Sequence, residues 1–374
     1  MSTTKHPIVL ILIMLGILIN SSVSSSAQDN KLAYSIPEGG NIYVNANTGN
    51  NANSGILTSP LKTLNETAKR INSAKGKGPI SVFISKGIYA LEETADFNPV
   101  DWEFSKENRL TIRAEVLPDD SNWNPGDMPV ILSTMPFSVE KNDSNKITGG
   151  QNFGIMIQES HVTIQGLRIL GEPVHENPYP GILIRNYPII WEGKNLEDLR
   201  VTQCLFIGNK YVMANHLGVL ANGSGLEVDH CLFYGVKDAV VMWNSPAAKS
   251  SFHHNLIVDS YGGIVWTWSA TDDFKFYNNV VSNANVLWML DKEEKLSYSI
   301  DNSVIVGYNS LVNKGGGAHG FGEKANQSKI TINKNVTLRK DGRLEIVEDL
   351  TSKRFLHIKP GTLGADLRAG LFTK

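Results

Sequence analysis

A short polar–apolar motif recurs through the second half of the chain and restricts what the sequence can fold into. Its copies are Gln203-Cys204-Leu205-Phe206, His230-Cys231-Leu232-Phe233, His254-Asn255-Leu256-Ile257, Asn278-Asn279-Val280-Val281 and Asp301-Asn302-Ser303-Val304. The second position of each copy falls at 204, 231, 255, 279 and 302, so the spacing is nearly constant. A period of this size is typical of stacked structural repeats. The sequence therefore favours one long repetitive domain over several ordinary ones.

Each repeat contains short segments of alternating apolar and polar residues, separated by Gly, Asn, Asp and Ser. Examples are Leu226-Glu227-Val228 and Ile264-Val265-Trp266, and earlier Leu110–Arg113 and Val162–Gln165. About 24 residues suit three short strands with three turns, which is one coil of a parallel β-helix with a strand spacing of about 4.8 Å. The sequence therefore predicts an all-β, single-stranded parallel β-helix. The second motif position then forms a ladder of like side chains, in which Asn can hydrogen-bond its copy in the next coil.

The two ends of the repeat region have different patterns. Residues 59–74 place Leu61, Leu64, Ala68 and Ile71 at helical spacing, which predicts a short amphipathic helix that caps the N-terminal end of the coils. Residues 336–374 lack the repeat, and we expect them to cover the other end. Cys204 and Cys231 occupy equivalent ladder positions, and we expect two stacked, buried thiols rather than a disulfide.

The N-terminal segment 1–27 is typical of a secretory signal. Lys5 precedes an apolar run from Ile8 to Ile19, and Ser25-Ser26-Ala27 resembles a cleavage site. We expect residues 1–27 to be removed and residues 28–374 to form the single β-helix domain, secreted or periplasmic. No later segment is long and apolar enough to predict a membrane helix.

Composition excludes several classes of function. The formal net charge is −2, with no long run of Lys or Arg, so the sequence does not predict nucleic-acid binding. Two cysteines are too few for a disulfide-dense scaffold or a cysteine-based zinc module.

Several segments resemble a family. The strand Ile42–Asn45, the stretches Gly49–Gly55 and Ser59–Leu64, and the later Asn-Asn-Val coils look like secreted right-handed β-helix proteins, among them pectate-lyase-like polysaccharide lyases. The chain also resembles the ulvan-oligosaccharide dehydratase type. The resemblance implies a carbohydrate-active enzyme whose partner is an acidic polysaccharide or oligosaccharide. Members of this superfamily cleave uronic-acid polymers by β-elimination, hydrolyse glycosides, epimerise uronates or only bind glycans.

The repeat register predicts which side chains share the outer face where a β-helix must carry its site, because apolar residues fill the core. Counting twelve residues on from the ladder gives an outward row of His216, Trp243, Thr267 and Asp291. The alternation in Ile155–Gln158 and Ile182–Arg185 adds Gln158 and Arg185 to the same row. A second row, six residues after the ladder, contains Lys210, Lys237, Tyr261 and Asn285, and Tyr211 and Asp238 follow directly. The two rows bring cations, imidazole, phenol and indole to one face.

β-Elimination on a uronic acid needs a cation at the carboxylate, a base for the C5 proton and an acid for the oxygen that leaves C4. Arg185 suits the carboxylate. The candidates for the base are His216, Lys210 and Lys237, and those for the acid are Tyr211 and Tyr261. Trp243 suits stacking on a sugar ring. Gln158, Tyr211 and Asp238 complete the expected substrate-binding set.

Each assignment has an alternative. Arg185 could pair with a turn carboxylate, the lysines could be solvated turn residues, and Trp243 could pack under a loop. No cofactor is required by the sequence. Calcium is an alternative neutralising group, with Asp238, Asp259, Glu172 and Glu176 as candidate ligands. A glycoside hydrolase would need two facing carboxyl groups, and the third class is a non-catalytic glycan-binding surface protein.

Overall fold

The computed structural model describes residues 34–171, 184–211, 217–243, 247–315 and 324–374. They belong to one compact unit, Ala33–Lys374. The expected signal segment 1–27, the candidate base His216, and the candidate calcium ligands Glu172 and Glu176 lie outside the described residues.

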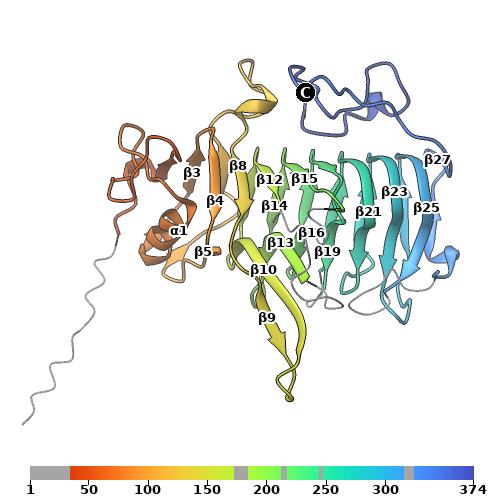
Figure 1. Ribbon diagram of the computed structural model, residues 1–374, viewed down its shortest axis with the longest axis horizontal. Coiled ribbons are helices and arrows are strands. Elements are labelled where there is room, and N and C mark those ends of the chain that lie inside the picture. Colours follow the sequence, from red (N-terminus) through yellow and green to blue (C-terminus); the bar gives the residue numbers. More distant parts are fainter. Residues whose placement is uncertain (1–33, 172–183, 212–216, 244–246, 316–323) are drawn as a thin grey trace, which may run out of the picture. The chain divides into compact units, whose positions relative to one another are not determined.

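The described residues wind into parallel coils with three strand-bearing walls, so the predicted all-β parallel β-helix is confirmed (Figure 1). Wall A is a sheet of parallel strands in which each neighbour comes from the next coil. In spatial order it contains β1 (Asn41–Val44), β3 (Ile80–Ile84), β7 (Leu110–Ala114), β11 (Val162–Gln165), β14 (Leu199–Thr202), β17 (Glu227–Asp229), β20 (Ser251–His253), β22 (Lys275–Tyr277), β24 (Tyr298–Asp301) and β26 (Ile330–Ile332).

Walls B and C belong to a second sheet because three long strands pass through both. Wall B contains β4 (Ile88–Leu91), β8 (Val130–Ser133), β12 (Arg168–Leu170), β15 (Leu205–Ile207), β18 (Leu232–Tyr234) and β27 (Thr337–Arg339). Wall C contains β5 (Ala95–Phe97), β10 (Ile147–Ile157), β13 (Ile184–Trp191), β16 (Leu217–Ala221) and β19 (Asp238–Met242). The long strands are β21 (Leu256–Thr267), β23 (Val280–Leu290) and β25 (Val304–Lys314).

Outside the walls, β9 (Ser138–Lys141) forms an antiparallel hairpin with β10, and β2 (Gly76–Lys77) pairs with β6 (Trp102–Glu103). The α-helix α1 spans Leu64–Ser73. Short 3-10 helices span Glu38–Gly40, Pro125–Asp127, Gln327–Lys329 and Ala365–Leu367.

The inward side chains of successive coils stack directly on one another and fill the core. Phe206 and Phe233 stack with ring centroids 4.6 Å apart, and Phe252 and Phe276 with centroids 5.6 Å apart. The predicted ladder is present beside this stack. Asn279 Oδ1 accepts from the Asn255 backbone N–H at 2.9 Å, and Asn255 Oδ1 accepts from the Cys231 N–H at 3.0 Å.

The fifth ladder position predicted from the sequence was wrong by one residue. Val280 pairs with Val304, so Ser303 rather than Asn302 lies next to Asn279, and the Ser303 hydroxyl accepts from the Asn279 N–H at 3.1 Å. The motif matching favoured an asparagine, but a serine hydroxyl accepts this hydrogen bond equally well. The step from Asn279 to Ser303 therefore has the same length as the step from Asn255 to Asn279.

The thiols of Cys204 and Cys231 are buried and unbridged, as expected. Burial raises the pKa of the Cys231 thiol well above its ordinary value. Each sulfur lies near backbone carbonyls of its own coil, such as Cys231 Sγ at 3.3 Å from Asp229 O. Both residues therefore act as small core side chains.

The expected capping helix is present as α1. The Thr63 side chain accepts from the Glu66 N–H and begins the helix, and Leu64, Ala68 and Ile71 are buried against the first coils. The expectation for residues 336–374 was wrong for all but the first residues, which form β27 and pair with β25 at the last coil. Leu344, Ile346, Leu356, Ile358 and Leu371 pack on the outer face of wall B rather than over the end of the coils.

Among the described residues, no helix has the length and apolar character needed to cross a membrane.

Candidate functional site

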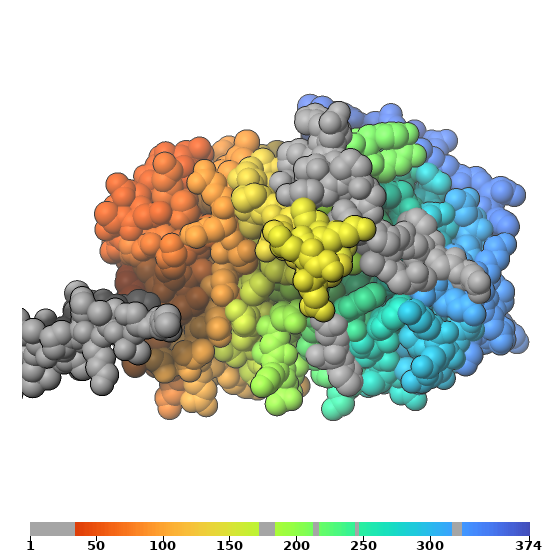
Figure 2. Space-filling model, turned by 60° about the horizontal axis from the view of Figure 1, so that its bottom comes forward, coloured from red at the N-terminus to blue at the C-terminus, as the bar shows by residue number. Residues whose placement is uncertain are grey.

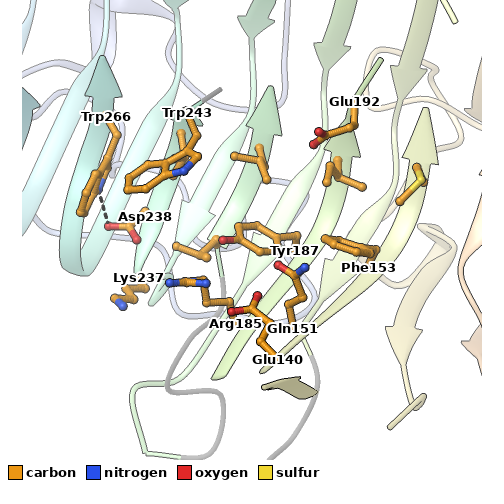
Figure 3. A pocket seen from close by; sticks show the side chains of 15 residues that line it. Glu140, Gln151, Phe153, Arg185, Tyr187, Glu192, Lys237, Asp238, Trp243 and Trp266 are labelled. Carbon is orange, nitrogen blue, oxygen red and sulfur yellow. Dashed lines mark hydrogen bonds between the residues drawn. The ribbon is translucent and has the colours of Figure 1, made fainter. Parts of the chain in front are cut away.

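A pocket of about 430 Å³ lies on the outer face of wall C (Figure 3). Wall C supplies its floor, because outward side chains from five successive coils lie side by side. The register pairs Met156 with Ile190, Ile190 with Leu220, Leu220 with Val241 and Val241 with Trp266. The floor is therefore an apolar strip of five side chains that runs across the coils.

Aromatic side chains border this strip on two sides. Phe153 and Tyr187 are paired in register and stacked, with ring centroids 5.8 Å apart. Trp243 stacks on Trp268 at 4.7 Å and lies 6.2 Å from the ring of Trp266. Flat aromatic faces of this kind suit the apolar face of a sugar ring. Burial raises the pKa of the Tyr187 phenol to about 12, so this hydroxyl keeps its proton at neutral pH.

Asp238 is a buried carboxyl group in the pocket wall. Its Oδ1 accepts from the Gly263 N–H at 2.6 Å and from the Trp266 indole N–H at 3.0 Å. No described residue donates a hydrogen bond to Oδ2. The neighbouring glycine gives the carboxyl its room, since a Cβ on Gly262 would lie 2.4 Å from Oδ1.

Burial also changes the acidity of Asp238. It raises the pKa above the ordinary value, although Lys237 and the two hydrogen bonds act in the opposite direction. A buried carboxyl group with a raised pKa in the wall of a pocket is suited to donating a proton.

Charged groups gather at the side of the pocket nearest the β9–β10 hairpin. Arg185 on β13 pairs in register with Gln151 on β10, and Glu140 projects from β9. Lys237 lies directly before Asp238, and Glu192 stands at the opposite edge of the floor (Figure 3). Glu192 Oε2 accepts from Asn222 Nδ2 at 2.8 Å. The site thus combines two cations, three carboxyl groups and an aromatic border.

The single column predicted from the sequence was wrong in two of its members. Trp191, Ala221 and Met242 are paired in register, so the residues that follow them, Glu192, Asn222 and Trp243, form one column. Arg185 precedes this column by seven residues. Thr267 is buried in the core, where its hydroxyl accepts from the Trp288 indole at 2.8 Å.

Arg185 was placed by matching Ile184-Arg185 to Ile157-Gln158, whereas the structure pairs Ile184 with Gly150. Unequal coils caused the other errors. Asn222 lies 18 residues after Cys204, whereas Trp243, in the same column, lies 12 residues after Cys231. A position counted from the ladder in one of these coils therefore does not match the same count in the other. A register shift between Ser260 and Gly263 adds one residue to the next coil. That shift turns Trp266, expected in the core, outward into the pocket.

Four of the candidate residues line the pocket: Arg185, Lys237, Asp238 and Trp243. Others lie elsewhere. Gln158 donates to Asp96 Oδ1 at 2.9 Å, and the Lys210 ammonium lies 5.0 Å from the centre of the exposed Tyr211 ring. Tyr261, whose carbonyl accepts from Asn285 Nδ2 at 3.2 Å, is also not among the residues that line the pocket. The catalytic roles of all these residues stay predictions, as does that of His216.

Several lining residues were not predicted, namely Glu140, Gln151, Phe153, Tyr187, Glu192 and Trp266. One signal was present. Gln151-Asn152-Phe153 and Arg185-Asn186-Tyr187 share a polar–Asn–aromatic pattern, and the structure pairs them in register. Asn186 Nδ2 donates to Asn152 Oδ1 at 2.6 Å inside the coils, so this asparagine pair marks a second ladder.

The histidines near the first ladder form a separate cluster on wall A. Arg200 makes two hydrogen bonds of 2.8 Å to the carboxylate of Asp229, and His230 Nδ1 lies 2.8 Å from the same carboxylate. Of the two calcium candidates that the structure describes, Asp259 pairs with Arg343 and does not line the pocket that contains Asp238. The described part of the chain contains no group of three or more His, Cys, Asp or Glu residues arranged for a metal ion.

Residues 139–286 match a family model described as a right handed beta helix region. This match agrees with the handedness implied by the family resemblance. No curated protein matches the sequence.

Solved structures with a similar fold include a GH136 lacto-N-biosidase from Eubacterium ramulus. Its native form has a TM-score of 0.44 and 11% identity, over 73% of this chain and 56% of that one. Its selenomethionine derivative has a TM-score of 0.43 and 10% identity, over 82% and 68%. A complex of XylC with xylose has a TM-score of 0.31 and 8% identity, over 73% and 68%. The chain thus spans just over half the length of the native lacto-N-biosidase.

Proposed function

We propose that this protein is a carbon–oxygen lyase that acts on uronic-acid-containing glycans and forms an unsaturated uronic acid by β-elimination at C4–C5. The observation that carries the proposal is the pocket itself, in which Arg185 and Lys237 lie with a buried carboxyl group of raised pKa, Asp238. Elimination needs a cation for the substrate carboxylate, a base and an acid, and these residues are of the required types. The signal expected in residues 1–27 would place the activity outside the cytoplasm.

The proposed reaction uses each group once. The Arg185 guanidinium pairs with the C6 carboxylate and makes the C5 proton more acidic. Lys237, in its uncharged amine form, takes that proton, and the electron pair of the C5–H bond forms the C4–C5 double bond as the C4–O bond breaks. Asp238 gives its proton to the departing oxygen. When that oxygen belongs to a sugar the protein is a polysaccharide lyase, and when it is the C4 hydroxyl the protein is an oligosaccharide dehydratase.

The distance between Glu192 and Asp238 argues against hydrolysis by this pair of carboxyl groups. Glu192 and Asp238 are separated by two strand spacings and five residues along the strand, about 19 Å between Cα atoms at ordinary strand dimensions. Paired carboxyl groups of glycosidases lie about 5–9.5 Å apart. Glu192 is also held by Asn222. This pair therefore does not meet the geometric requirement of a glycoside hydrolase.

Product analysis tests the proposal. The mature protein is incubated with oligosaccharides of galacturonic, glucuronic and mannuronic acid, and ultraviolet absorbance and product mass are recorded. A new double bond with chain scission identifies a lyase, and one with loss of water alone identifies a dehydratase. New reducing ends without absorbance would show a hydrolase and overturn the proposal, and binding without any product would show a glycan-binding protein.

Substitution of Lys237 tests the assignment of the base. We expect Lys237→Ala to lower kcat by about 100-fold or more, in the range of a removed general base. Lys275→Ala is the matched control, because Lys275 is an exposed strand residue on wall A. The sequence-based prediction that His216→Ala is similarly inactive can be tested in the same assay. Normal turnover by Lys237→Ala would contradict the proposed base.

A further inference from the structure

The β9–β10 hairpin forms one boundary of the pocket and is fixed to the coils. Its first strand pairs with β10 through Lys141↔Ile147 and Ser138↔Gln151. The opposite edge of β10 pairs with β13 from Gly150↔Ile184 onward. Because β10 is hydrogen-bonded on both sides, the base of the hairpin is part of the sheet. Figure 1 shows the hairpin extending beyond the coils, and in Figure 2 the same yellow segment stands forward from this face.

A glycine lets the hairpin place a carboxylate over the sheet. Glu140 is the register partner of Gly149, and a Cβ on Gly149 would lie 2.5 Å from Glu140 Oε2. The carboxylate therefore occupies space that any other residue at 149 would fill. Gln151, two residues further along β10, is the register partner of Arg185. Glu140 and Gln151 thus form a hydrogen-bonding edge next to the proposed carboxylate site.

The charges divide this end of the pocket into two parts. Arg185 attracts the carboxylate of a uronic acid, whereas Glu140 repels it. A carboxylate accepts strong hydrogen bonds from neutral hydroxyl groups, and its two oxygens match two adjacent hydroxyls of a sugar ring. The Glu140 side of the site is therefore suited to hydroxyl groups. A glycan that continued past this point would meet the hairpin.

We propose that Glu140 is a specificity-determining residue that binds the hydroxyl groups of the last sugar unit, so that the protein acts on chain ends. The hairpin excludes the next unit, and Gly149 keeps the position of the carboxylate open. This inference rests on the proposed function for its reaction. The binding preference itself can be measured without turnover.

Binding of end-modified oligosaccharides tests the inference. Titration calorimetry uses tetragalacturonate, tetramannuronate and a glucuronic-acid tetrasaccharide, each unmodified, O-methylated on one terminal unit, or O-methylated on the other. We expect wild type to bind one of the two end-methylated forms at least about tenfold more weakly than the unmodified chain, about 1.4 kcal/mol. In Glu140→Ala this difference should disappear, and in Gly149→Ala, where the new methyl group shifts the end of the Glu140 side chain, it should become smaller. Gly126→Ala, whose Cβ would contact nothing within 4 Å, is the matched control and should keep it.

Kinetics separate a binding role from a structural one. Glu140→Ala should raise KM about tenfold or more with kcat within about threefold of wild type, because the lost contact is made in both ground and transition states. On a long polymer, wild type should release a small product of constant size while the remaining chains shorten slowly.

The two proposals fail in different ways. Equal binding of the free and both methylated forms to wild type, no binding of any probe, or early appearance of mid-length fragments would overturn end selectivity. Selective binding without any unsaturated product would instead overturn the lyase proposal and support the role of Glu140 in recognising chain ends.

Discussion

Asp238 shows how local surroundings decide the chemistry of a single residue. If the neighbouring strand did not cover it, the carboxylate would be solvated and ionised. Here the chain at Gly262 packs closely against the carboxyl group. Its Oδ1 accepts hydrogen bonds from both Gly263 N–H and the Trp266 indole N–H. Burial then raises its pKa, which keeps a proton on the residue over a wider range of pH.

Replacement of Asp238 by asparagine removes the acidic proton and keeps the size and shape of the side chain. Asp238→Asn keeps an Oδ1 acceptor for Gly263 and Trp266, and we expect kcat to fall at least about 100-fold in the double-bond assay. Wild-type activity should decrease as pH rises through the pKa of Asp238, because the ionised carboxyl has no proton to give.

Asp238→Asn should affect stability in the opposite sense to activity. The folded state holds the proton of Asp238 more tightly than the unfolded chain, so this residue costs stability as pH rises through its folded pKa. Asp238→Asn should therefore be at least as stable as wild type at pH 7 in urea unfolding. Asp259→Asn, in a carboxyl group paired with Arg343 outside the pocket, is the activity control. An active Asp238→Asn would contradict the role as acid.

At the scale of the elements, each coil is held to the next by side-chain ladders as well as by strand pairing. The buried amide of Asn255 donates to Val228 O at 2.9 Å and accepts from Cys231 N at 3.0 Å, which joins two coils at a turn. Cysteines occupy the two preceding ladder positions and Ser303 the last. The ladder thus tolerates different small side chains where the neighbouring backbone groups find other partners.

Loss of the Asn255 amide should destabilise the coils strongly. Asn255→Ala leaves the Cys231 N–H and the Val228 carbonyl buried without these partners, and each such group costs about 1–3 kcal/mol. We expect the free energy of unfolding to fall by about 3 kcal/mol. Asn309→Ala removes an exposed amide that donates to Asn285 Oδ1 at 3.0 Å, and it should cost less than about 1 kcal/mol. Equal losses in urea unfolding would show that the buried ladder adds nothing beyond strand pairing.

At the scale of the whole chain, segments far apart in sequence cover the coils. The C-terminal segment packs Leu344, Ile346, Leu356, Ile358 and Leu371 against wall B. His357 fastens this segment, because its Nε2 accepts from the Leu371 N–H at 3.0 Å and its Nδ1 lies 3.1 Å from Phe355 O. The neutral imidazole fits both partners, with Nδ1 as the donor. A protonated ring would present a second N–H to that of Leu371.

This arrangement predicts acid-sensitive docking of the C-terminal segment. Burial lowers the pKa of His357 from 6.5 to about 4, so the folded state binds its proton less readily than the unfolded chain. The stability it contributes is complete above pH 6.5 and is lost as pH falls toward 4, at most about 3 kcal/mol. The protection factor of the Leu371 amide, which compares its exchange rate with that of an unfolded chain at the same pH, should fall in that window. His357→Gln should flatten this dependence, and a pH-independent protection factor in wild type would contradict the assignment.

The sequence alone determined the coil architecture and the capping helix, because a nearly constant repeat period and alternating strands admit few other folds. It also determined most of the ladder, since like side chains stack wherever coils have equal length. Only the tertiary structure decided which side chains share the pocket. The unequal coil after Cys204 and the register shift before Gly263 change which residues face outward, and no local pattern shows them.

The C-terminal cover depends on contacts between segments distant in sequence, as between Thr373 and Asp119. Such contacts depend on which surfaces the finished coils leave exposed, so they are decided only when the whole chain has folded.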